Sequence, residues 1–369
     1  MTGTRRDFIG AAVLAAGVSA TGLPLFARAG ERHAADEPLD ILILGGTGFI
    51  GPHMVREAMR RGHSVTLFNR GRTNAALFPD LETIKGDRDG GLDGLKGRRW
   101  NAVIDNSGYV PRHVEDSARL LSPHCDRYVF VSTISVYRDI MAARDEDAPL
   151  ATIADESIEE VTGETYGALK ALCEKRAASE IGDDRLTILR PTFICGPGDR
   201  TDRFTYWPVR TRKGGAMLWP GTPADTIQIV DVRDLANFTI DCLEQSINGI
   251  YNAVNPPQSY SMGELLEDCR AVTAGKVEPV WIPQGFLADN GMNPGAQLPV
   301  WTGSESGLSL SGERAFAAGF HHRPERETIR DLMTWWDTLP RERRNALRAG
   351  PGVESEADVI AAFRRQGET

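Results

Sequence analysis

The sequence has few cysteines, no excess of basic residues and no long apolar run. Its five cysteines among 369 residues are too few for a disulfide framework, and none lies at a metal-ligand spacing. Lys and Arg number 42 against 51 Asp and Glu, a formal net charge of -9 without the basic balance typical of nucleic-acid binding. The weakly apolar residues 11–26 are too few to span a bilayer as a stable helix. We therefore expect no metal site, no nucleic-acid partner and no stable membrane insertion.

The overall composition is that of a globular protein. Hydrophobic residues make up 41% of the chain and charged residues 25%, which excludes a disordered, collagenous or coiled-coil protein. The 38 glycines indicate many tight turns, as in α/β proteins. The length allows one large domain or two smaller ones with a sizeable core.

A pair of arginines precedes the weakly apolar run at the N-terminus. Thr4–Phe8 reads Thr-Arg-Arg-Asp-Phe, and the run is followed by Ala27–Ala29, whose small residues are typical of a cleavage site. These features resemble a twin-arginine (Tat) export signal, Ser/Thr-Arg-Arg-x-Phe-Leu-Lys, with Ile9 and Gly10 departing from it. We expect residues 1–29 to be this signal, the Tat translocase to be a transient partner, and the mature protein to be periplasmic. The alternative is an uncleaved cytoplasmic protein.

Apolar runs and helical patterns alternate after the polar residues 30–38, which we interpret as a linker. Leu39–Leu44 is a continuous apolar run, as expected of a strand buried on both faces of a parallel sheet. Further strands are expected at Ser64–Phe68, Asn101–Asp105, Arg127–Ser132 and Leu186–Leu189, and helices at Ile50–Arg61, Val114–Leu121 and Glu164–Ile181. This alternation predicts an α/β fold with a doubly wound parallel sheet and right-handed crossovers.

A glycine motif lies between the first expected strand and the first expected helix. It reads Gly-Gly-Thr-Gly-Phe-Ile-Gly over residues 45–51. Gly45 permits the tight turn, Gly48 lets the backbone approach a phosphate, and Gly51 lets the helix pack against the sheet. In this strand-turn-helix context, the motif predicts a dinucleotide site with the pyrophosphate at the helix N-terminus.

Together with four later segments, the motif resembles the extended short-chain dehydrogenase/reductase superfamily, in particular its NAD-dependent epimerase/dehydratase branch. The four segments are Val131–Tyr137, Tyr166–Lys170, Leu189–Asp199 and Val230–Ala236. The resemblance implies a Rossmann-type fold with a smaller C-terminal substrate lobe, and a homodimer. We expect a NAD(P)-binding domain at 39–200, a substrate lobe partly interleaved with the sheet at 201–340, and a C-terminal tail at 341–369.

Tyr166 and Lys170 are the expected centre of the chemistry. Separated by four positions, both face the same side of a helix. A tyrosine with a pKa near 10 is a poor base, and a nearby ammonium would lower that pKa. Tyr166 would then accept a proton from a substrate hydroxyl while hydride leaves for the cofactor. The resemblance implies that Thr133 hydrogen-bonds the same oxygen.

The end of the second expected strand bears on the choice between NAD and NADP. It reads Asn69-Arg70-Gly71-Arg72, without the acid that usually binds the ribose of NAD. Since arginine pairs with a 2′-phosphate, we expect NADP, with Asn69 serving NAD as the alternative. The expected cofactor-binding residues are Gly45, Gly48, Phe49, Ile50, Gly51, Asn69, Arg70, Arg72, Asp87, Asn106, Ser107, Lys170 and Pro191.

Three segments concern the substrate. Asp225-Thr226 stands where nucleotide-sugar members of the family carry an arginine, which weakens the case for such a substrate. The acidic residues 138–162 make the span from Thr133 to Tyr166 longer than is usual in the family. They form either a loop over the active site or a loop exposed to solvent. A basic group is either a contact for an anionic substrate or a solvated surface; it comprises Arg203, Arg210, Arg212 and Lys213.

These features predict an exported NAD(P)-dependent epimerase/dehydratase-like oxidoreductase for a sugar or other hydroxylated small molecule, with its cofactor retained. One alternative is a non-catalytic dinucleotide-binding protein, because the Asn-Arg-Gly strand ending also resembles regulatory and RNA-associated members of the family. Another is a cytoplasmic NADPH-dependent reductase. The presence of Thr133, Tyr166 and Lys170 favours an enzyme.

Overall fold

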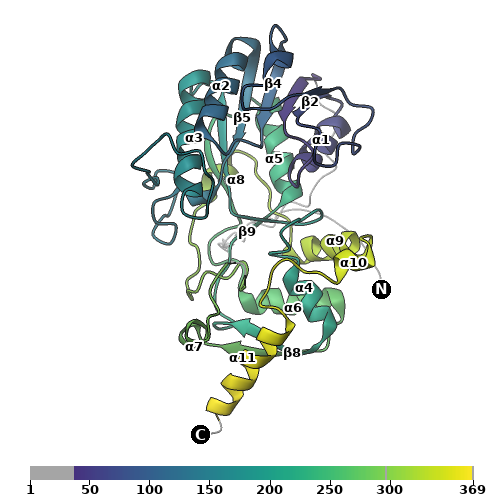
Figure 1. Ribbon diagram of the computed structural model, residues 1–369, viewed down its shortest axis with the longest axis vertical. Helices are drawn as coiled ribbons and strands as arrows, with labels where there is room; N and C mark the ends of the chain where they lie inside the picture. Colours follow the sequence, from purple (N-terminus) through teal and green to yellow (C-terminus); the bar gives the residue numbers. More distant parts are fainter. Residues whose placement is uncertain (1–36, 296, 368–369) are drawn as a thin grey trace, which may run out of the picture. The chain divides into compact units, whose positions relative to one another are not determined.

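The computed structural model of the protein describes residues 37–295 and 297–367 (Figure 1). The expected export signal, residues 1–29, and most of the expected linker, 30–38, lie outside the described residues. Within the described part of the chain, no helix has the length and apolar character needed to cross a bilayer. The described residues all fall in one compact unit of the chain.

Seven parallel strands form the central sheet, in the order β10-β6-β5-β4-β1-β2-β3. Their bounds are β1 Asp40–Leu44, β2 Ser64–Asn69, β3 Thr83–Lys85, β4 Trp100–Asp105, β5 Cys125–Val131, β6 Leu186–Pro191 and β10 Gly249–Ala253. The chain order reverses between β1 and β4. In an open α/β sheet, ligands bind outside the carboxyl ends of the strands at such a reversal.

The first strand is buried on both faces, as its apolar run predicts. Ile41 and Ile43 contact one layer of helices, α1 (Gly51–Arg60) and α5 (Val232–Glu244). Leu42 and Leu44 face the opposite layer, α2 (Pro111–Leu121) and α3 (Tyr166–Ile181). Figure 1 shows these two helix pairs on either side of the strands. The seven-stranded sheet covered on both faces confirms the predicted α/β, Rossmann-type fold.

A C-terminal lobe with its own aromatic core follows the sheet. Its elements are α4 (Tyr206–Lys213), β8 (Gly215–Pro220), α6 (Met262–Thr273), β11 (Val277–Ile282), α7 (Gln284–Asp289), α9 (Glu325–Asp337), α10 (Arg341–Arg344) and α11 (Val353–Gln366). Strands β8 and β11 pair in parallel, and Trp207, Trp219 and Trp336 are fully buried beside them. A short parallel pair, β7 (Phe193–Cys195) with β9 (Ile229–Asp231), connects this lobe to the sheet.

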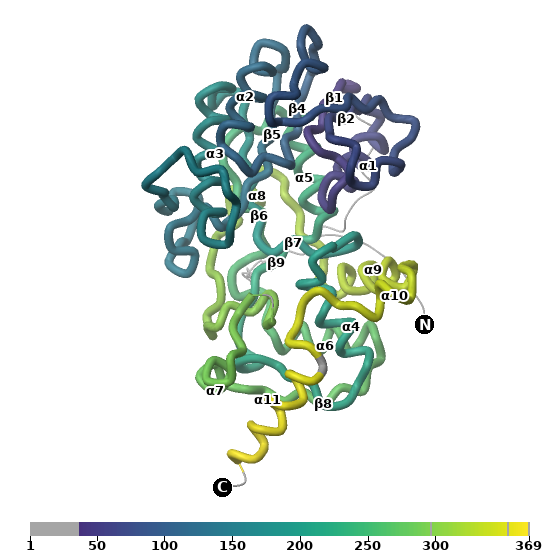
Figure 2. Tube along the Cα trace, viewed as in Figure 1, coloured from purple at the N-terminus to yellow at the C-terminus, as the bar shows by residue number. Residues whose placement is uncertain are grey.

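The chain passes between the sheet and the C-terminal lobe more than once, as Figure 2 shows. After α4 and β8 it returns through β9 to α5 and β10, which belong to the main sheet, before forming α6. The short helix α8 (Glu313–Ala317) also contacts β10. The remaining elements are the 3-10 turns η1 (Asp93–Leu95), η2 (Ser122–His124) and η3 (Ile134–Val136).

The last described residues belong to the core of the lobe. Val359 and Ile360 of α11 are buried in it. The buried Glu356 carboxylate accepts hydrogen bonds from Arg210 Nε (2.7 Å) and from the backbone N–H of Leu218 (3.0 Å). We expected residues 341–369 to form a tail, but its described part, up to residue 367, is integral to the lobe.

Candidate active site

A cavity of about 1030 Å³ lies at the carboxyl ends of the central strands, between the sheet and the C-terminal lobe. Each of the catalytic and cofactor-binding residues predicted above lines it: Gly45, Gly48, Phe49, Ile50, Gly51, Asn69, Arg70, Arg72, Asp87, Asn106, Ser107, Thr133, Tyr166, Lys170 and Pro191. The cavity therefore brings together residues spread over most of the first 191 positions.

The glycine motif forms the floor of one end of the cavity. Gly45 and Gly46 have φ angles of +111° and +90°, which side-chain-bearing residues rarely adopt. A Cβ on Gly51 would lie 2.5 Å from Gly46 Cα, so the first turn of α1 packs directly on the loop. A Cβ on Gly48 would meet nothing within 4 Å, because this glycine borders open space. The cradle fits a dinucleotide pyrophosphate held by backbone N–H groups.

Replacing Gly51 with alanine is expected to disturb this cradle. The added Cβ overlaps the Gly46 backbone, and relieving the overlap costs on the order of 1–3 kcal/mol of unfolding free energy. Urea unfolding and a dinucleotide titration measure the two consequences, lower stability and weaker binding. Gly285→Ala is the matched control, since its Cβ would meet nothing within 4 Å. Equal behaviour of the two variants would contradict the close packing.

The end of β2 is tied to the glycine motif. Asn69 Nδ2 donates a hydrogen bond to the carbonyl oxygen of Gly45 (3.3 Å), and its Oδ1 accepts one from the backbone N–H of Gly71 (2.8 Å). The guanidinium of Arg70 lies 4.0 Å from the Asp87 carboxylate, and both side chains are exposed. Sequence reasoning missed Asn74, whose amide donates to the Thr47 carbonyl oxygen across the same loop (3.0 Å).

Asn106 and Ser107 follow β4 on the opposite wall. Ser107 Oγ donates to the carbonyl oxygen of Leu44 (2.9 Å), which joins the ends of β4 and β1. A Cβ on Gly45 would lie 2.4 Å from Asn106 Oδ1, so the Asn106 amide lies directly against the glycine loop. These two polar side chains line the channel at the position where the sheet order reverses.

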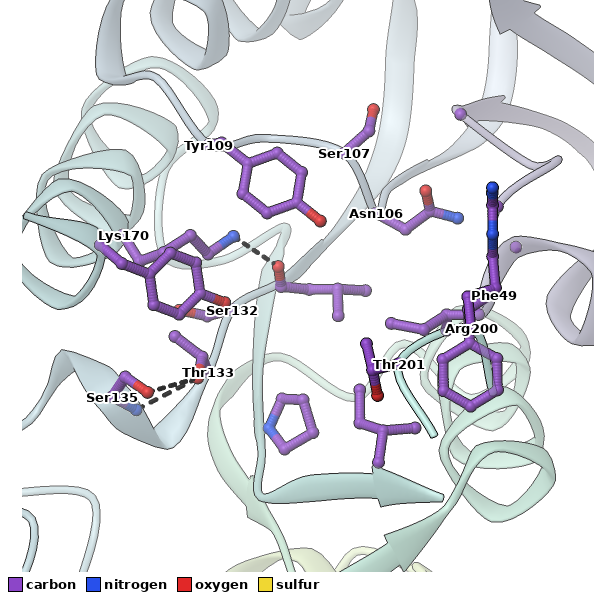
Figure 3. Close-up of a pocket in the computed structure, with 18 of the residues that line it drawn as sticks. Phe49, Asn106, Ser107, Tyr109, Ser132, Thr133, Ser135, Lys170, Arg200 and Thr201 are labelled. Carbon is purple, nitrogen blue, oxygen red and sulfur yellow. Dashed lines mark hydrogen bonds between the residues drawn. The ribbon is translucent and has the colours of Figure 1, made fainter. Parts of the chain in front are cut away.

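Thr133 and Tyr166 are held near each other because the turn η3 packs against the first turn of α3. Thr133 caps η3, and its Oγ1 accepts a hydrogen bond from the Ser135 N–H (3.1 Å; Figure 3). Tyr166 is the first residue of α3, and a Cβ on the next residue, Gly167, would lie 2.2 Å from the Ser135 carbonyl oxygen. Only glycine permits this contact, which holds the start of α3 against the turn that carries Thr133.

The electrostatic environment of Tyr166 opposes its ionisation. Burial raises the pKa of the Tyr166 phenol, and so does Tyr109, whose ring centroid lies 6.4 Å away. The Thr133 hydroxyl and the Arg203 guanidinium lower the same pKa. The free protein therefore holds Tyr166 in its protonated form at neutral pH.

Lys170 is buried one turn further along α3. Its Nζ donates to the carbonyl oxygens of Gly108 (2.7 Å) and Val131 (2.8 Å; Figure 3) and lies 4.1 Å from the Phe130 ring centroid. Burial lowers the pKa of Lys170 to about 8. The Lys170 ammonium is expected from the sequence to lower the Tyr166 pKa; in the structure the leading groups that lower it are Thr133 and Arg203.

Several lining residues lie outside the predicted set of catalytic and cofactor-binding residues. The acidic insertion contributes Ile140 and Met141, so part of residues 138–162 forms a wall of the cavity. From the C-terminal half come Arg200, Thr201, Arg203, Pro294, Gly295, Trp301, Thr302 and Leu308. Of the basic group weighed for an anionic substrate, Arg203 lines the cavity, while Arg210 and Arg212 pair with Glu356 and Asp337.

Asp225 is not a ligand contact but a structural anchor for a lining residue. Its buried carboxylate accepts hydrogen bonds from Trp301 Nε1 (2.7 Å) and from Thr222 Oγ1 (2.6 Å). Trp301 in turn lines the cavity. Nucleotide-sugar members of the family that the chain resembles carry an arginine at this position. In this chain Asp225 instead holds the indole of Trp301.

The parallel sheet, the glycine motif and the cavity at the strand-order reversal define a Rossmann-type fold. Residues 41–93 match the family described as "NAD dependent epimerase/dehydratase family". The chain is 28% identical over 306 residues to "Epimerase family protein SDR39U1" of Bos taurus, covering 76% of this chain and 95% of that protein. It is also 28% identical over 239 residues to "Chloroplast stem-loop binding protein of 41 kDa b, chloroplastic" of Arabidopsis thaliana, a match that spans 59% of each.

Solved structures show the same fold. "MoeE5 in complex with UDP-glucuronic acid and NAD" superposes with a TM-score of 0.57 at 19% identity, over 83% of this chain and 100% of that one. The Bordetella bronchiseptica enzyme WbmG in complex with NAD and UDP superposes with a TM-score of 0.61 at 15% identity, over 86% and 99%. At these identities the likeness concerns the fold.

Proposed function

We propose that the protein is a NAD(P)-dependent oxidoreductase of the epimerase/dehydratase type, acting on a sugar or another hydroxylated small molecule. One observation carries the proposal: the same cavity is lined by the glycine motif and by Thr133, Tyr166 and Lys170. The proposed dinucleotide site and the proposed proton-transfer group therefore lie in one cavity.

The dinucleotide, when bound, supplies a hydride acceptor or donor at its nicotinamide ring. In this chain, the backbone of residues 45–51 would hold its pyrophosphate, with Asn106 and Ser107 along the channel. Tyr166 Oη accepts the proton of a substrate hydroxyl, and Thr133 Oγ1 holds the same oxygen by a hydrogen bond. Burial raises the Tyr166 pKa, and the positive charge of Arg203 acts in the opposite direction, toward the phenolate.

The two cofactors differ in one group, the 2′-phosphate. Arg70 and Arg72 after β2, without an acid at the strand end, support NADP. In contrast, the solved neighbours MoeE5 and WbmG are complexes with NAD. We propose NADP on the residues of this chain, and a side-by-side titration of the apoprotein with NADP and NAD decides the matter.

The experiment that tests the proposed function needs no substrate. The purified protein is denatured, and the released small molecules are identified by mass spectrometry. In a second measurement, folded protein without ligand is titrated with each dinucleotide. Stoichiometric NADP(H) or NAD(H), or saturable binding of either, is the expected result. Folded protein that releases no dinucleotide and binds none would overturn the proposal.

A rival proposal, a non-catalytic dinucleotide-binding protein, has the stem-loop binding relative in its favour. Against it stand the complete Thr133, Tyr166 and Lys170 set in the cavity and the net charge of -9. A bound dinucleotide whose redox state never changes with any hydroxylated substrate would support this rival.

We further propose export by the twin-arginine route with the cofactor loaded beforehand, on the pattern of residues 4–29. Retention would suit a redox-neutral reaction such as epimerisation or dehydration. Cell fractionation and the mass of the mature N-terminus test export, with a start near Gly30 expected. Loss of most of the cofactor on desalting would contradict retention.

The pH dependence of turnover tests the role of Arg203. Because its charge lowers the pKa of Tyr166, Arg203→Ala is expected to move the rising limb of the pH–rate profile to higher pH. Arg212→Ala is the control, since that side chain pairs with Asp337 away from the cavity. An unmoved limb would show that Arg203 does not act on the phenol.

A further inference from the structure

The loop between β7 and α4, residues 196–205, packs against the start of α1. His53 Nε2 donates a hydrogen bond to the carbonyl oxygen of Pro197 (2.8 Å). A Cβ on Gly198 would lie 3.5 Å from Phe49 Cδ2 and 3.7 Å from His53 Nε2. The loop therefore lies beside the glycine motif, on the side of the cavity that the C-terminal lobe supplies.

Arg200 brings an uncompensated positive charge to this place. It is exposed, lines the cavity, and forms no ion pair with any carboxylate of the described residues. Figure 3 labels Arg200 among the residues that line the cavity. Among the described lining residues the sole carboxylate is Asp87, which already faces Arg70. In a chain with a net charge of -9, the positive charge that these arginines bring to the cavity points to an anionic ligand.

The backbone that carries Arg200 is fixed by buried carboxylates. Asp199 accepts hydrogen bonds from the N–H (2.8 Å) and Oγ1 (2.7 Å) of Thr201. Asp202, buried with φ at +60°, accepts one from the N–H of Arg348 (2.8 Å). Nη1 of Arg348 donates to the carbonyl oxygen of Arg200 itself (2.8 Å). The loop is thus pre-organised, which reduces the entropy that ligand binding would otherwise cost.

We propose that Arg200 binds the pyrophosphate of the dinucleotide from the side opposite the glycine motif. The inference rests on the proposed function, since it presupposes a dinucleotide in the cavity. Backbone N–H groups and the α1 dipole act on one side of the diphosphate, and the guanidinium pairs bidentately on the other. The cofactor is then held by both lobes, and residues 343–348, which fix the loop, contribute to its retention.

Binding constants test this assignment without turnover. Arg200→Ala is expected to weaken the dinucleotide and ADP-ribose by the same factor, roughly 10- to 100-fold, because both carry the pyrophosphate. Adenosine, which lacks it, should bind Arg200→Ala and wild type equally. Arg200→Lys should fall between them, since it keeps the charge and loses the bidentate geometry. The control is Arg330→Ala, an exposed arginine of α9 outside the cavity, which should leave all three constants unchanged.

Each outcome separates this inference from the proposed function. Wild type that binds no dinucleotide overturns the proposed function. Wild type that binds, with Arg200→Ala binding equally well, overturns the role of Arg200 and leaves the proposed function standing. Unchanged dinucleotide affinity with a raised substrate KM would place Arg200 on the substrate, which also overturns the inference. Unfolding curves of each variant establish that the fold is intact.

Discussion

Replacing Tyr166 with phenylalanine is expected to lower kcat by roughly 10²- to 10⁴-fold while leaving dinucleotide affinity within a few-fold of wild type. The change removes one oxygen at the start of α3 and retains the ring. Proton transfer through that oxygen is lost, whereas the glycine motif and the channel residues are untouched. Steady-state kinetics and a cofactor titration on the same preparation measure the two quantities.

The control makes the same chemical change where no chemistry is expected. Tyr251 lies in β10 and donates its hydroxyl to the Asn248 carbonyl oxygen (2.8 Å), outside the cavity. Tyr251→Phe should leave kcat unchanged. If Tyr166→Phe retained full activity, the proton acceptor would have to be another group, and the proposed mechanism would fail. If it lost the dinucleotide as well, the loss of rate would not report on proton transfer.

Local signals account for the parts of the site that the sequence predicted. The apolar run of β1, the glycine spacing and the four-residue separation of Tyr166 and Lys170 are each contained in a few neighbouring residues. Such short patterns dictate turn conformation and helix face directly. For this reason the glycine motif and the expected catalytic pair, whose spacing is readable in the sequence, line one cavity.

Contacts between distant residues account for what the sequence did not show. Trp301 lines the cavity because Asp225, 76 positions earlier, holds its indole. Arg200 lines the cavity on a loop to which Arg348, 148 positions later, donates a hydrogen bond. The burial that sets the Lys170 pKa is likewise a product of tertiary packing. No pattern within a window of ordinary length contains these pairings.

The buried ion pair behind the turn that carries Thr133 is expected to dominate stability. Arg190 of β6 is 1% exposed and donates through Nε (3.0 Å) and Nη2 (2.6 Å) to the Glu174 carboxylate of α3. The same carboxylate accepts from Ser132 Oγ, next to Thr133 in the chain. Arg190→Ala leaves a buried carboxylate without its cation, at a cost of about 3–5 kcal/mol of unfolding free energy.

An exposed pair of the same geometry provides the comparison. Arg98 donates to both oxygens of Glu82 at 2.8 and 2.7 Å, yet both side chains are more than a third exposed. Arg98→Ala should therefore cost under about 1 kcal/mol, because water screens the exposed pair. Urea unfolding of both variants gives the two values.

A double variant separates the loss of the pair from the burial of a lone charge. In Arg190→Met with Glu174→Leu both charges of the pair are removed, so much of the stability lost in Arg190→Ala should return. Turnover should nevertheless fall in the double variant, because replacing Glu174 removes the acceptor of Ser132 and the turn carrying Thr133 loses its support. A cost for Arg190→Ala as small as that for Arg98→Ala would show that water or a backbone shift compensates Glu174. Full activity in the double variant would show that the pair stabilises the fold without positioning Thr133.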